Sequence, residues 1–284
     1  MPPVNFDYHR PKSVAEAVSM LAGAEGAKAL AGGHSLLPAM NLRLAQPDSI
    51  VDIGRLSELK GVRVSGGALH IGALTTHAQI AASADVKTHA PALASAAGKI
   101  GDPMVRNRGT LGGNVAHADP ASDPPTVLVA YDAIIHIHGA DGARSAAAAD
   151  FFIDALTTDL NPGDLITEIE IPSHAAHRSA YVKMAHPASR YALVGVCVCL
   201  NLDGGACKSA SVAVGGVTGK PMRSPEAESA LVGTSLDDAA LNAAASALMD
   251  SIQADAIGDM FASESYRVAM AGVYLKRAVR AALG

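Results

Sequence analysis

The sequence predicts an α+β protein of two or three domains. Its 284 residues exceed the usual size of a single hydrophobic core. The first 53 residues alternate helix and strand signals around a glycine turn, whereas the residues after Pro172 form a run of strand signals followed by a run of helix signals. This change of pattern indicates that two different arrangements of helices and strands follow one another along the chain.

The opening segment is predicted to form a small α/β unit around a glycine turn. Ser13 and Glu16 have the capping-box spacing that starts a helix. The expected elements, in order, are a helix at 13–22, a strand at 27–32, a helical turn from Pro38 and a strand at 49–53. The turn AGGHSLL at 31–37 therefore lies between a strand and a helix, where backbone amides can bind phosphate. A plain tight turn is the alternative, because the segment lacks both GK[ST] and G-x-G-x-x-G.

The middle of the chain is predicted to consist of strands and short helices. Gly66 and Gly67 interrupt an alternating segment at 62–72, which is typical of a two-residue hairpin. Further expected elements are a helix from Thr75 or Thr76 to 83, a helix at 91–100, strands at 133–139, 143–148 and 165–172, and either a helix or a strand at 125–132.

The last part of the chain is predicted to be a three-stranded meander followed by helices. The strands are expected at 180–184, 192–202 and 208–217, and the helices at 224–233, 235–250 and 264–283. Ser235 and Asp238 have capping-box spacing at the start of the second helix. Because no low-complexity linker separates these parts, we expect the domains to pack directly on one another.

The stretch from Ile100 to Pro125 is the densest in residues that position backbone amides. It contains Gly109, Gly112 and Gly113, which can adopt positive φ or let a ligand approach the main chain closely. Other polar groups flank these glycines: Arg106, Arg108, Thr110, Asn114, Asp119 and Asp123. The segment is predicted to be a long loop that holds a nucleotide, with an ordinary Gly/Pro-rich surface loop as the alternative.

Composition excludes several classes of function. A formal net charge of -5 without any Lys/Arg block argues against a nucleic-acid partner. The apolar runs are far too short for a membrane span. The N-terminus lacks the apolar region of a signal peptide, so a cytoplasmic location is expected. The three cysteines, Cys197, Cys199 and Cys207, are predicted to be reduced core thiols, and they are too few for an all-cysteine iron–sulfur cluster.

No catalytic or metal-binding motif is found. His136 and His138 share one face of a strand, and His174 and His177 are three residues apart in a loop, but no third ligand has a defined spacing and there is no HExxH. There is no G-x-S-x-G either. The two glycine segments remain, and together they predict a nucleotide or dinucleotide binder, since backbone amides can hold a pyrophosphate without burying several cations.

Three motifs resemble one known family. AGGHSLLPAMNLRL with VDIGRL, RNRGTLGGNVAHADPASDPP, and VKMAHPASRYALVGV are similar to the FAD-binding medium subunit of the molybdenum hydroxylases, and most of all to the aerobic carbon monoxide dehydrogenase type. The resemblance covers essentially the whole chain. It implies a two-part FAD-binding domain of the vanillyl-alcohol-oxidase (PCMH) type at 1–175, with subdomains at 1–55 and 56–175, and a C-terminal domain at 176–284 with a three-stranded antiparallel sheet and helices.

The resemblance also implies a set of cofactor contacts. Those expected at the FAD pyrophosphate are Ala31, Gly32, Gly33, His34, Ser35, Leu36 and Leu37 in the first segment, and Thr110, Leu111, Gly112, Gly113 and Asn114 in the second. Asp123 is expected at the ribose or adenine, and Tyr191 against the isoalloxazine ring. Ile100, Ile166 (or its neighbour Leu165) and Lys183 fall where the family has further FAD contacts. Arg106 and Arg108 are expected to brace the loop or to meet a neighbouring subunit.

The function implied is electron transfer within a larger complex. Electrons would leave a molybdopterin centre on a large subunit, pass through two [2Fe-2S] clusters on a small subunit and reach non-covalent FAD on this chain before going to an external acceptor. A dimer of heterotrimers is the implied assembly. Two alternatives stay open: a self-contained oxidase with FAD covalently joined to His34, and an assembly subunit that binds no flavin. The substrate and the acceptor, whether NAD, a quinone or oxygen, are not indicated.

Overall fold

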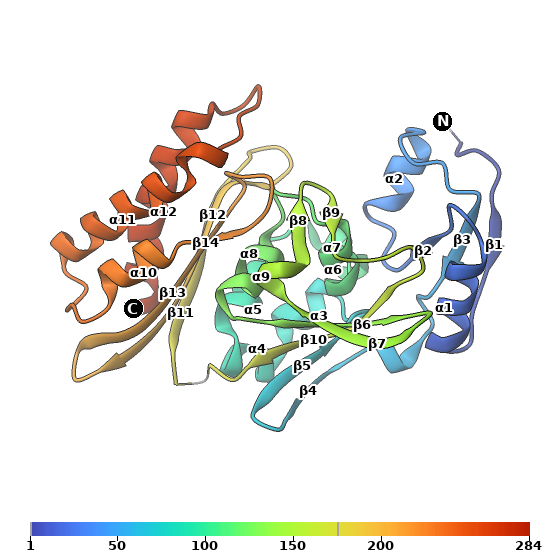
Figure 1. The fold of residues 1–284 in the computed structure, drawn as a ribbon, viewed down its shortest axis with the longest axis horizontal. Helices are drawn as coiled ribbons and strands as arrows, with labels where there is room; N and C mark the ends of the chain where they lie inside the picture. Colours follow the sequence, from blue (N-terminus) through green and yellow to red (C-terminus); the bar gives the residue numbers. More distant parts are fainter. Residues whose placement is uncertain (1, 175) are drawn as a thin grey trace.

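The computed structural model describes residues 2–174 and 176–284. Three parts follow one another across the molecule: an N-terminal α/β unit, a central sheet with helices, and a C-terminal sheet covered by helices (Figure 1). The predicted α+β class is confirmed. No helix of the described chain combines the length and apolar character needed to cross a membrane.

The N-terminal unit contains a small parallel sheet of strand order β1-β3-β2. Its elements are β1 (Asp7–His9), α1 (Val14–Gly23), β2 (Lys28–Leu30), α2 (Leu36–Asn41) and β3 (Ser49–Asp52). As predicted, Ser13 caps α1 by accepting a hydrogen bond from the Glu16 backbone N–H at 3.2 Å. The glycine turn connects β2 to α2, which begins two residues before the predicted helical start at Pro38.

The central part is built on a five-stranded antiparallel sheet of order β4-β5-β10-β6-β7. Its strands are β4 (Val62–Ser65), β5 (Ala68–Gly72), β6 (Ile134–Gly139), β7 (Gly142–Ala147) and β10 (Leu165–Pro172), and a separate ribbon is formed by β8 (Phe152–Asp154) and β9 (Thr157–Thr158). Its helical elements are η1 (Ser57–Leu59), α3 (His77–Ala82), α4 (Ala84–His89), α5 (Pro91–Gly98), α6 (Pro103–Arg108), α7 (Leu111–His117), α8 (Asp123–Ala130) and α9 (Ala148–Phe151). The predicted hairpin at Gly66 and Gly67 is confirmed, and both residues have positive φ.

The stretch from Ile100 to Pro125 is not the long loop that the sequence predicts, because α6, α7 and the start of α8 occupy most of it. Asp102 caps α6, with Pro103 in the first turn, and Thr110 caps α7. These caps satisfy the first backbone donors of each short helix. Glycine and proline in the stretch therefore mark helix starts and close packing. Of the segment at 125–132, for which helix and strand were both open, residues 125–130 belong to α8.

The C-terminal sheet has four antiparallel strands, in the order β11-β12-β13-β14, so the predicted three-stranded sheet was wrong by one strand. The strands are β11 (Arg178–Ala185), β12 (Ala192–Asp203), β13 (Ala206–Gly215) and β14 (Met222–Arg223). The fourth strand has only two residues, too few to give a periodic pattern. The remaining elements are α10 (Pro225–Leu231), α11 (Asp238–Ile252), η2 (Gln253–Asp255) and α12 (Glu264–Leu283).

Helix α11 starts later than the sequence predicts. Its N-cap is Asp237, whose carboxylate accepts a hydrogen bond from the Ala240 N–H at 3.0 Å. Ser235 does not cap the helix, and its hydroxyl donates to the Asp237 carboxylate instead. Leu236 between them has a φ of +58°, which is incompatible with a right-handed helix.

The two faces of the C-terminal sheet belong to different cores. Alternate residues of β12, including Val196 and Val198, pack with α10, α11 and α12, whereas Cys197 and Cys199 join the core of the central part. All three cysteines are buried free thiols, as predicted.

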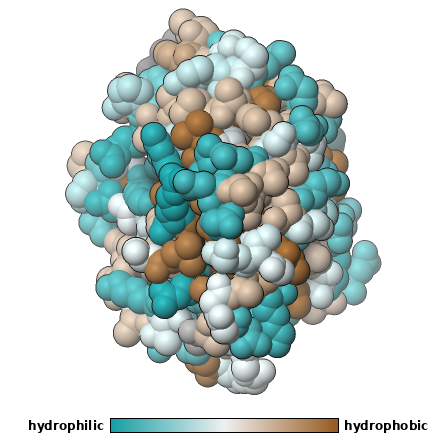
Figure 2. Space-filling view, turned by 90° about the vertical axis from the view of Figure 1, so that its left-hand side faces the viewer, coloured by the Kyte–Doolittle hydropathy of each residue, from teal (hydrophilic) through white to brown (hydrophobic). Residues whose placement is uncertain are grey.

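The helical end of the molecule, opposite the N-terminal unit, shows polar and apolar side chains interspersed over its outer surface (Figure 2).

Candidate functional site

The two glycine segments lie against each other, although about 80 residues separate them in sequence. A Cβ added at Gly32 would lie 2.2 Å from the Arg108 carbonyl oxygen, and one added at Gly113 would lie 3.6 Å from the Ala31 Cβ. The contact at Gly32 is so close that only glycine fits there. The chain therefore brings the two predicted segments into one place.

The first segment presents a run of backbone donors. In the described chain, the N–H groups of residues 32 to 36 make no hydrogen bond with another protein group. Gly33 has a φ of +76°, which turns the backbone between β2 and α2. Successive free amides at such a turn form a concave anion site. His34 is exposed, and its Nδ1 lies 3.1 Å from the Gly32 carbonyl oxygen.

The second segment uses its donors differently. The Leu111 N–H donates to the Thr75 carbonyl at 3.0 Å, the Gly112 N–H to the Ala73 carbonyl at 2.8 Å, and the Gly113 N–H to the Thr110 hydroxyl at 3.2 Å. These bonds anchor the start of α7 on the segment that follows β5. The second segment is thus a fixed wall beside the first, and the first offers the free donors.

A buried polar cluster lies at the other end of α7. The Asp123 carboxylate accepts hydrogen bonds from the Tyr181 hydroxyl at 2.6 Å and from the Lys183 ammonium at 2.7 Å. Both charged side chains are only 4% exposed. Burial raises the pKa of Asp123, and Lys183 and Tyr181 oppose that shift. The cluster ties α8 to β11.

Tyr191 lies beside this cluster, at the start of β12. Its side chain is about half buried, and burial together with the negative charges of Asp119 and Asp123 raises the pKa of its phenol. The next residue, Ala192, donates its N–H to the Ala121 carbonyl at 3.1 Å, which holds this end of β12 on the turn between α7 and α8. Tyr191 therefore has a partly exposed ring near the carboxylates that follow the second glycine segment.

The other predicted residues differ in accessibility. Ile166 is buried in β10 within the central core, whereas Ile100 and Leu37 are partly or largely accessible. Arg106 donates to the carbonyls of Ile100 at 2.9 Å and Gly101 at 3.3 Å, so it braces the chain before α6 as expected. Arg108 is exposed.

Sequence reasoning missed Tyr181 and Lys99. The Lys99 ammonium donates to the Tyr181 carbonyl at 2.7 Å, and burial desolvates its charge, which lowers its pKa. Tyr181 and Lys183 are two residues apart on one strand and so share a face. That spacing was the available signal, but only the tertiary structure shows that the face meets Asp123.

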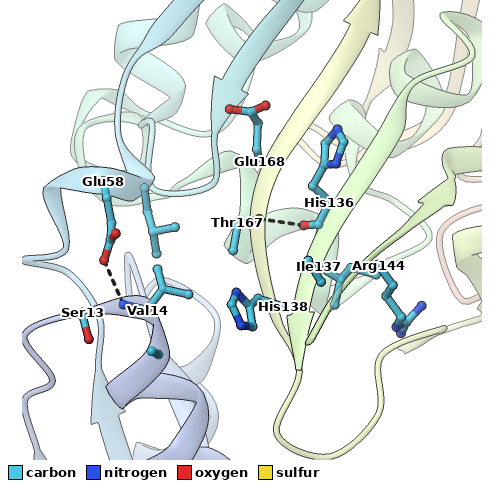
Figure 3. A pocket seen from close by; sticks show the side chains of 12 residues that line it. Ser13, Val14, Glu58, His136, Ile137, His138, Arg144, Thr167 and Glu168 are labelled. Atoms are coloured by element: carbon cyan, nitrogen blue, oxygen red, sulfur yellow. Dashed lines mark hydrogen bonds between the residues drawn. The ribbon is translucent and has the colours of Figure 1, made fainter. Parts of the chain in front are cut away.

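A separate surface cavity of about 560 Å³ lies between the start of α1 and the central sheet (Figure 3). Its lining includes Glu58, His136, His138, Arg144 and Glu168, and it includes no residue of the two glycine segments. The charged groups already have partners in the described chain: Glu58 accepts from the Val14 N–H, Glu168 pairs with Arg63 and His70, and Arg144 pairs with Asp159 and Asp164. The cavity is therefore distinct from the candidate site.

Comparison with known proteins identifies the class to which this fold and site belong. Residues 4–174 match the family model described as "FAD binding domain in molybdopterin dehydrogenase". Residues 179–282 match "CO dehydrogenase flavoprotein C-terminal domain". The protein is thus an FAD-binding flavoprotein.

Individual relatives define the family more closely. The chain is 41% identical to the carbon monoxide dehydrogenase medium chain of Afipia carboxidovorans, over 99% of this chain and 98% of that one. It is 42% identical to the glyceraldehyde dehydrogenase medium chain of Sulfolobus acidocaldarius, over 84% and 85%. The reconstituted carbon monoxide dehydrogenase of Oligotropha carboxidovorans contains a chain that superimposes with a TM-score of 0.95 at 40% identity, with 99% of each chain covered.

The chain belongs to the FAD-binding medium subunits of the molybdenum hydroxylase family. It is accordingly a flavoprotein subunit of an oxidoreductase complex of the carbon monoxide dehydrogenase type. The resemblance stated from the three sequence motifs is confirmed.

Proposed function

We propose that this chain binds one FAD non-covalently, as the electron-transfer subunit of a molybdenum-containing hydroxylase or dehydrogenase. The observation that carries the proposal is the run of free N–H donors at residues 32 to 36, closed on one side by the second glycine segment. Neutral amides suit an enclosed pyrophosphate, because they supply several donors without burying cations. The two-part domain would then be of the vanillyl-alcohol-oxidase type.

The remaining contacts are assigned by their positions around this turn. We assign Thr110 and Asn114, with Leu111, Gly112 and Gly113, to the wall beside the pyrophosphate. Asp123 and Lys183 would serve the nucleotide mainly by fixing the start of α8 on β11, since each satisfies the other's charge. The half-exposed Tyr191 is assigned to the flavin ring, and Ile100 and Ile166 to further contacts.

FAD, when bound, supplies the carrier between the [2Fe-2S] clusters of a small partner subunit and an external acceptor. The molybdopterin centre would lie on a large partner subunit, in a dimer of heterotrimers. The free buried thiols are compatible with a reducing, cytoplasmic setting. Two medium chains at 41% and 42% identity carry the names of enzymes for different substrates, which supports a role in which this subunit does not choose the substrate.

A pair of glycine variants tests the site. Gly113→Val places a side chain against the Thr110 hydroxyl, which a Cβ would meet at 2.9 Å, and toward Ala31 in the contact between the two segments. We expect the dissociation constant for FAD to rise at least about tenfold, which is about 1.4 kcal/mol. Gly23→Val is the matched control, because a Cβ at Gly23 meets no atom within 4 Å. Equal FAD affinity in wild type and Gly113→Val would overturn the assignment.

Two further experiments separate the alternatives. Acid precipitation should release all flavin into the supernatant, whereas flavin retained in the pellet would support a covalent bond to His34. Chain that stays colourless after incubation with FAD would support a flavin-free assembly role. In the purified complex without FAD, the substrate should still reduce the iron–sulfur clusters, but turnover with the acceptor should be abolished. Turnover that continues without FAD would exclude the proposed electron route.

A further inference from the structure

Three metal-ligating side chains converge where β10 leads into β11. His174 and His177 lie in this connection, and Cys199 comes from the adjacent strand β12. The two Nδ1 atoms are 2.9 Å apart, and the Cys199 Sγ lies 3.3 Å from the Nδ1 of His174 and 3.5 Å from that of His177. The sequence indicated the histidine pair and predicted no metal site, because the third ligand is more than 20 residues away on a strand.

These separations are close to those of a metal-bound triad. Zinc binds imidazole nitrogen at about 2.0–2.1 Å and thiolate sulfur at about 2.3 Å in tetrahedral geometry. Tetrahedral angles then put two such nitrogens roughly 3.3 Å apart, and a nitrogen and the sulfur roughly 3.5 Å apart. Two of the three contacts are shorter than this, the one between the two imidazoles at 2.9 Å and the one between the Cys199 Sγ and the His174 Nδ1 at 3.3 Å. A shift of a few tenths of an ångström between these side chains would open both.

The surroundings orient His174 as a ligand. Its Nε2 lies 3.2 Å from the Tyr131 carbonyl oxygen and donates to it, which leaves the Nδ1 lone pair directed at the other two groups. The ring also packs against the Tyr131 ring, with centroids 4.8 Å apart. Such a bond from the second ring nitrogen to a carbonyl is the usual support of a metal-bound histidine. The neutral imidazole is the form that coordinates a metal.

The donor set and its exposure indicate the kind of ion. Two imidazoles and one thiolate favour a borderline or soft cation over Mg²⁺ or Ca²⁺, which prefer oxygen ligands. Cys199 is buried, whereas both histidines are partly exposed, so an ion can enter from solvent. The nearby charges, Asp132 and Arg223, are paired with each other. Three protein ligands leave one position for water.

We propose that His174, His177 and Cys199 bind one Zn²⁺ ion, which fastens the connection between the central part and the C-terminal sheet. On binding, the S–H bond of Cys199 breaks, sulfur bonds to the metal and the proton goes to solvent; no electron is transferred. The thiolate is the form that binds a metal, so binding at Cys199 releases this proton. The site is independent of the proposed FAD site.

Calorimetric titration of chelator-treated, FAD-loaded chain with Zn²⁺ tests the proposal. We expect one ion per chain, and about one proton released from the thiol, measured by repeating the titration in buffers of different ionisation enthalpy. Co²⁺ in place of Zn²⁺ should give a thiolate-to-metal charge-transfer band and the intense visible bands of a tetrahedral site. Cys199→Ala should abolish the charge-transfer band.

Matched variants make the result decisive. His177→Gln and Cys199→Ala should each weaken Zn²⁺ binding at least about 100-fold, the upper range for losing even an outer partner of a metal ligand. Cys207→Ala, another buried free thiol, and His138→Gln, from the other histidine pair, should leave binding unchanged. We expect the His177→Gln variant to fold, because the side chain it alters is partly exposed. FAD retention by the variant checks this. Absence of stoichiometric binding, or equal binding in all four variants, would overturn the proposal.

Discussion

At the scale of single residues, burial next to the candidate site opposes the protonation of one histidine, His77. His77, the first residue of α3, is 3% exposed, and its Nδ1 has no hydrogen-bond partner in the described chain. A Cβ at Gly109 would lie 2.9 Å from the His77 ring, so the imidazole fills the space behind the second glycine segment. Burial lowers the pKa of His77 from 6.5 to about 4.

This burial predicts a loss of stability in mild acid. Below pH 6.5 the unfolded chain binds a proton at His77 that the folded chain does not accept until about pH 4, so the free energy of unfolding falls as pH decreases through this window. The total loss from this residue is about 3 kcal/mol. We expect His77→Leu to lose correspondingly less stability between pH 7 and pH 4 than wild type does, measured by urea unfolding. Parallel pH profiles for the two proteins would show that His77 is not the cause.

The buried ion pair gives a second prediction. Lys183→Met leaves the Asp123 carboxylate buried beside a neutral side chain, and we expect a loss of about 3 kcal/mol in the free energy of unfolding without FAD. The exposed control Lys60→Met should change stability by less than about 0.5 kcal/mol. In the double variant Asp123→Leu with Lys183→Met, the loss should be smaller than the sum of the single losses. An additive double variant would mean that the two charges do not interact.

At the scale of elements, α7 shows what sequence patterns reveal and what they miss. Gly112 in TLGGN does allow a close approach, but its neighbour is Ala73 of the same chain. No pattern in the sequence predicts this neighbour, or that a Cβ at Gly113 would meet the Thr110 hydroxyl and Ala31. Thr110 caps α7, and the first N–H groups of this helix donate to carbonyl groups of the same chain. The segment that the sequence predicts to be a ligand loop is therefore a short helix packed against a sheet. Helix propensity ranks glycine low, and here tertiary packing overrides it.

The same helix yields a prediction on packing. A Cβ at Gly112 would lie 2.5 Å from the Ala73 Cβ and 2.9 Å from its backbone, so Gly112→Ala must push α7 away from the sheet. We expect a loss of about 1–3 kcal/mol of stability and a reduced FAD content after purification. Gly23→Ala, in a helix end with open space, is the control. Wild-type stability in Gly112→Ala would show that α7 can move without cost.

Element boundaries were predictable where caps and periodicity agree, as in α1, α12 and the β4–β5 hairpin. They were missed where a long-range contact decides, as in the two-residue strand β14, and where one residue with positive φ delays a helix, as Leu236 does before α11. The histidine pair at 174 and 177 is a similar case, because its partner Cys199 lies on a separate strand. Motifs in the sequence identify the candidate site residues. They do not predict bonds such as that between Asp123 and Tyr181, because these bonds depend on how distant elements pack.

At the scale of the whole molecule, the central core is completed by the C-terminal sheet. Tyr181, Cys197, Cys199 and Ala213 belong to the same hydrophobic cluster as the central strands and helices. The Tyr131 hydroxyl lies 2.6 Å from the Ser179 hydroxyl and accepts a hydrogen bond from the Ala92 N–H. The opposite face of the sheet has its own cluster with α10, α11 and α12. The central core therefore depends on the C-terminal sheet, whereas the core between that sheet and its helices does not depend on the central part.

This inequality predicts how fragments behave. The fragment 178–284 keeps a complete core between its sheet and helices, and we expect it to unfold cooperatively in urea. The fragment 1–177 loses the sheet that covers its central core, together with Lys183 and Tyr191, so we expect exposed apolar surface, dye binding and poor FAD retention. Mixing the fragments should restore FAD binding, because the missing face and both side chains return together. A fragment 1–177 that unfolds as cooperatively as the full chain and retains FAD would mean that the central part is autonomous and that the polar cluster at Asp123 contributes little to the site.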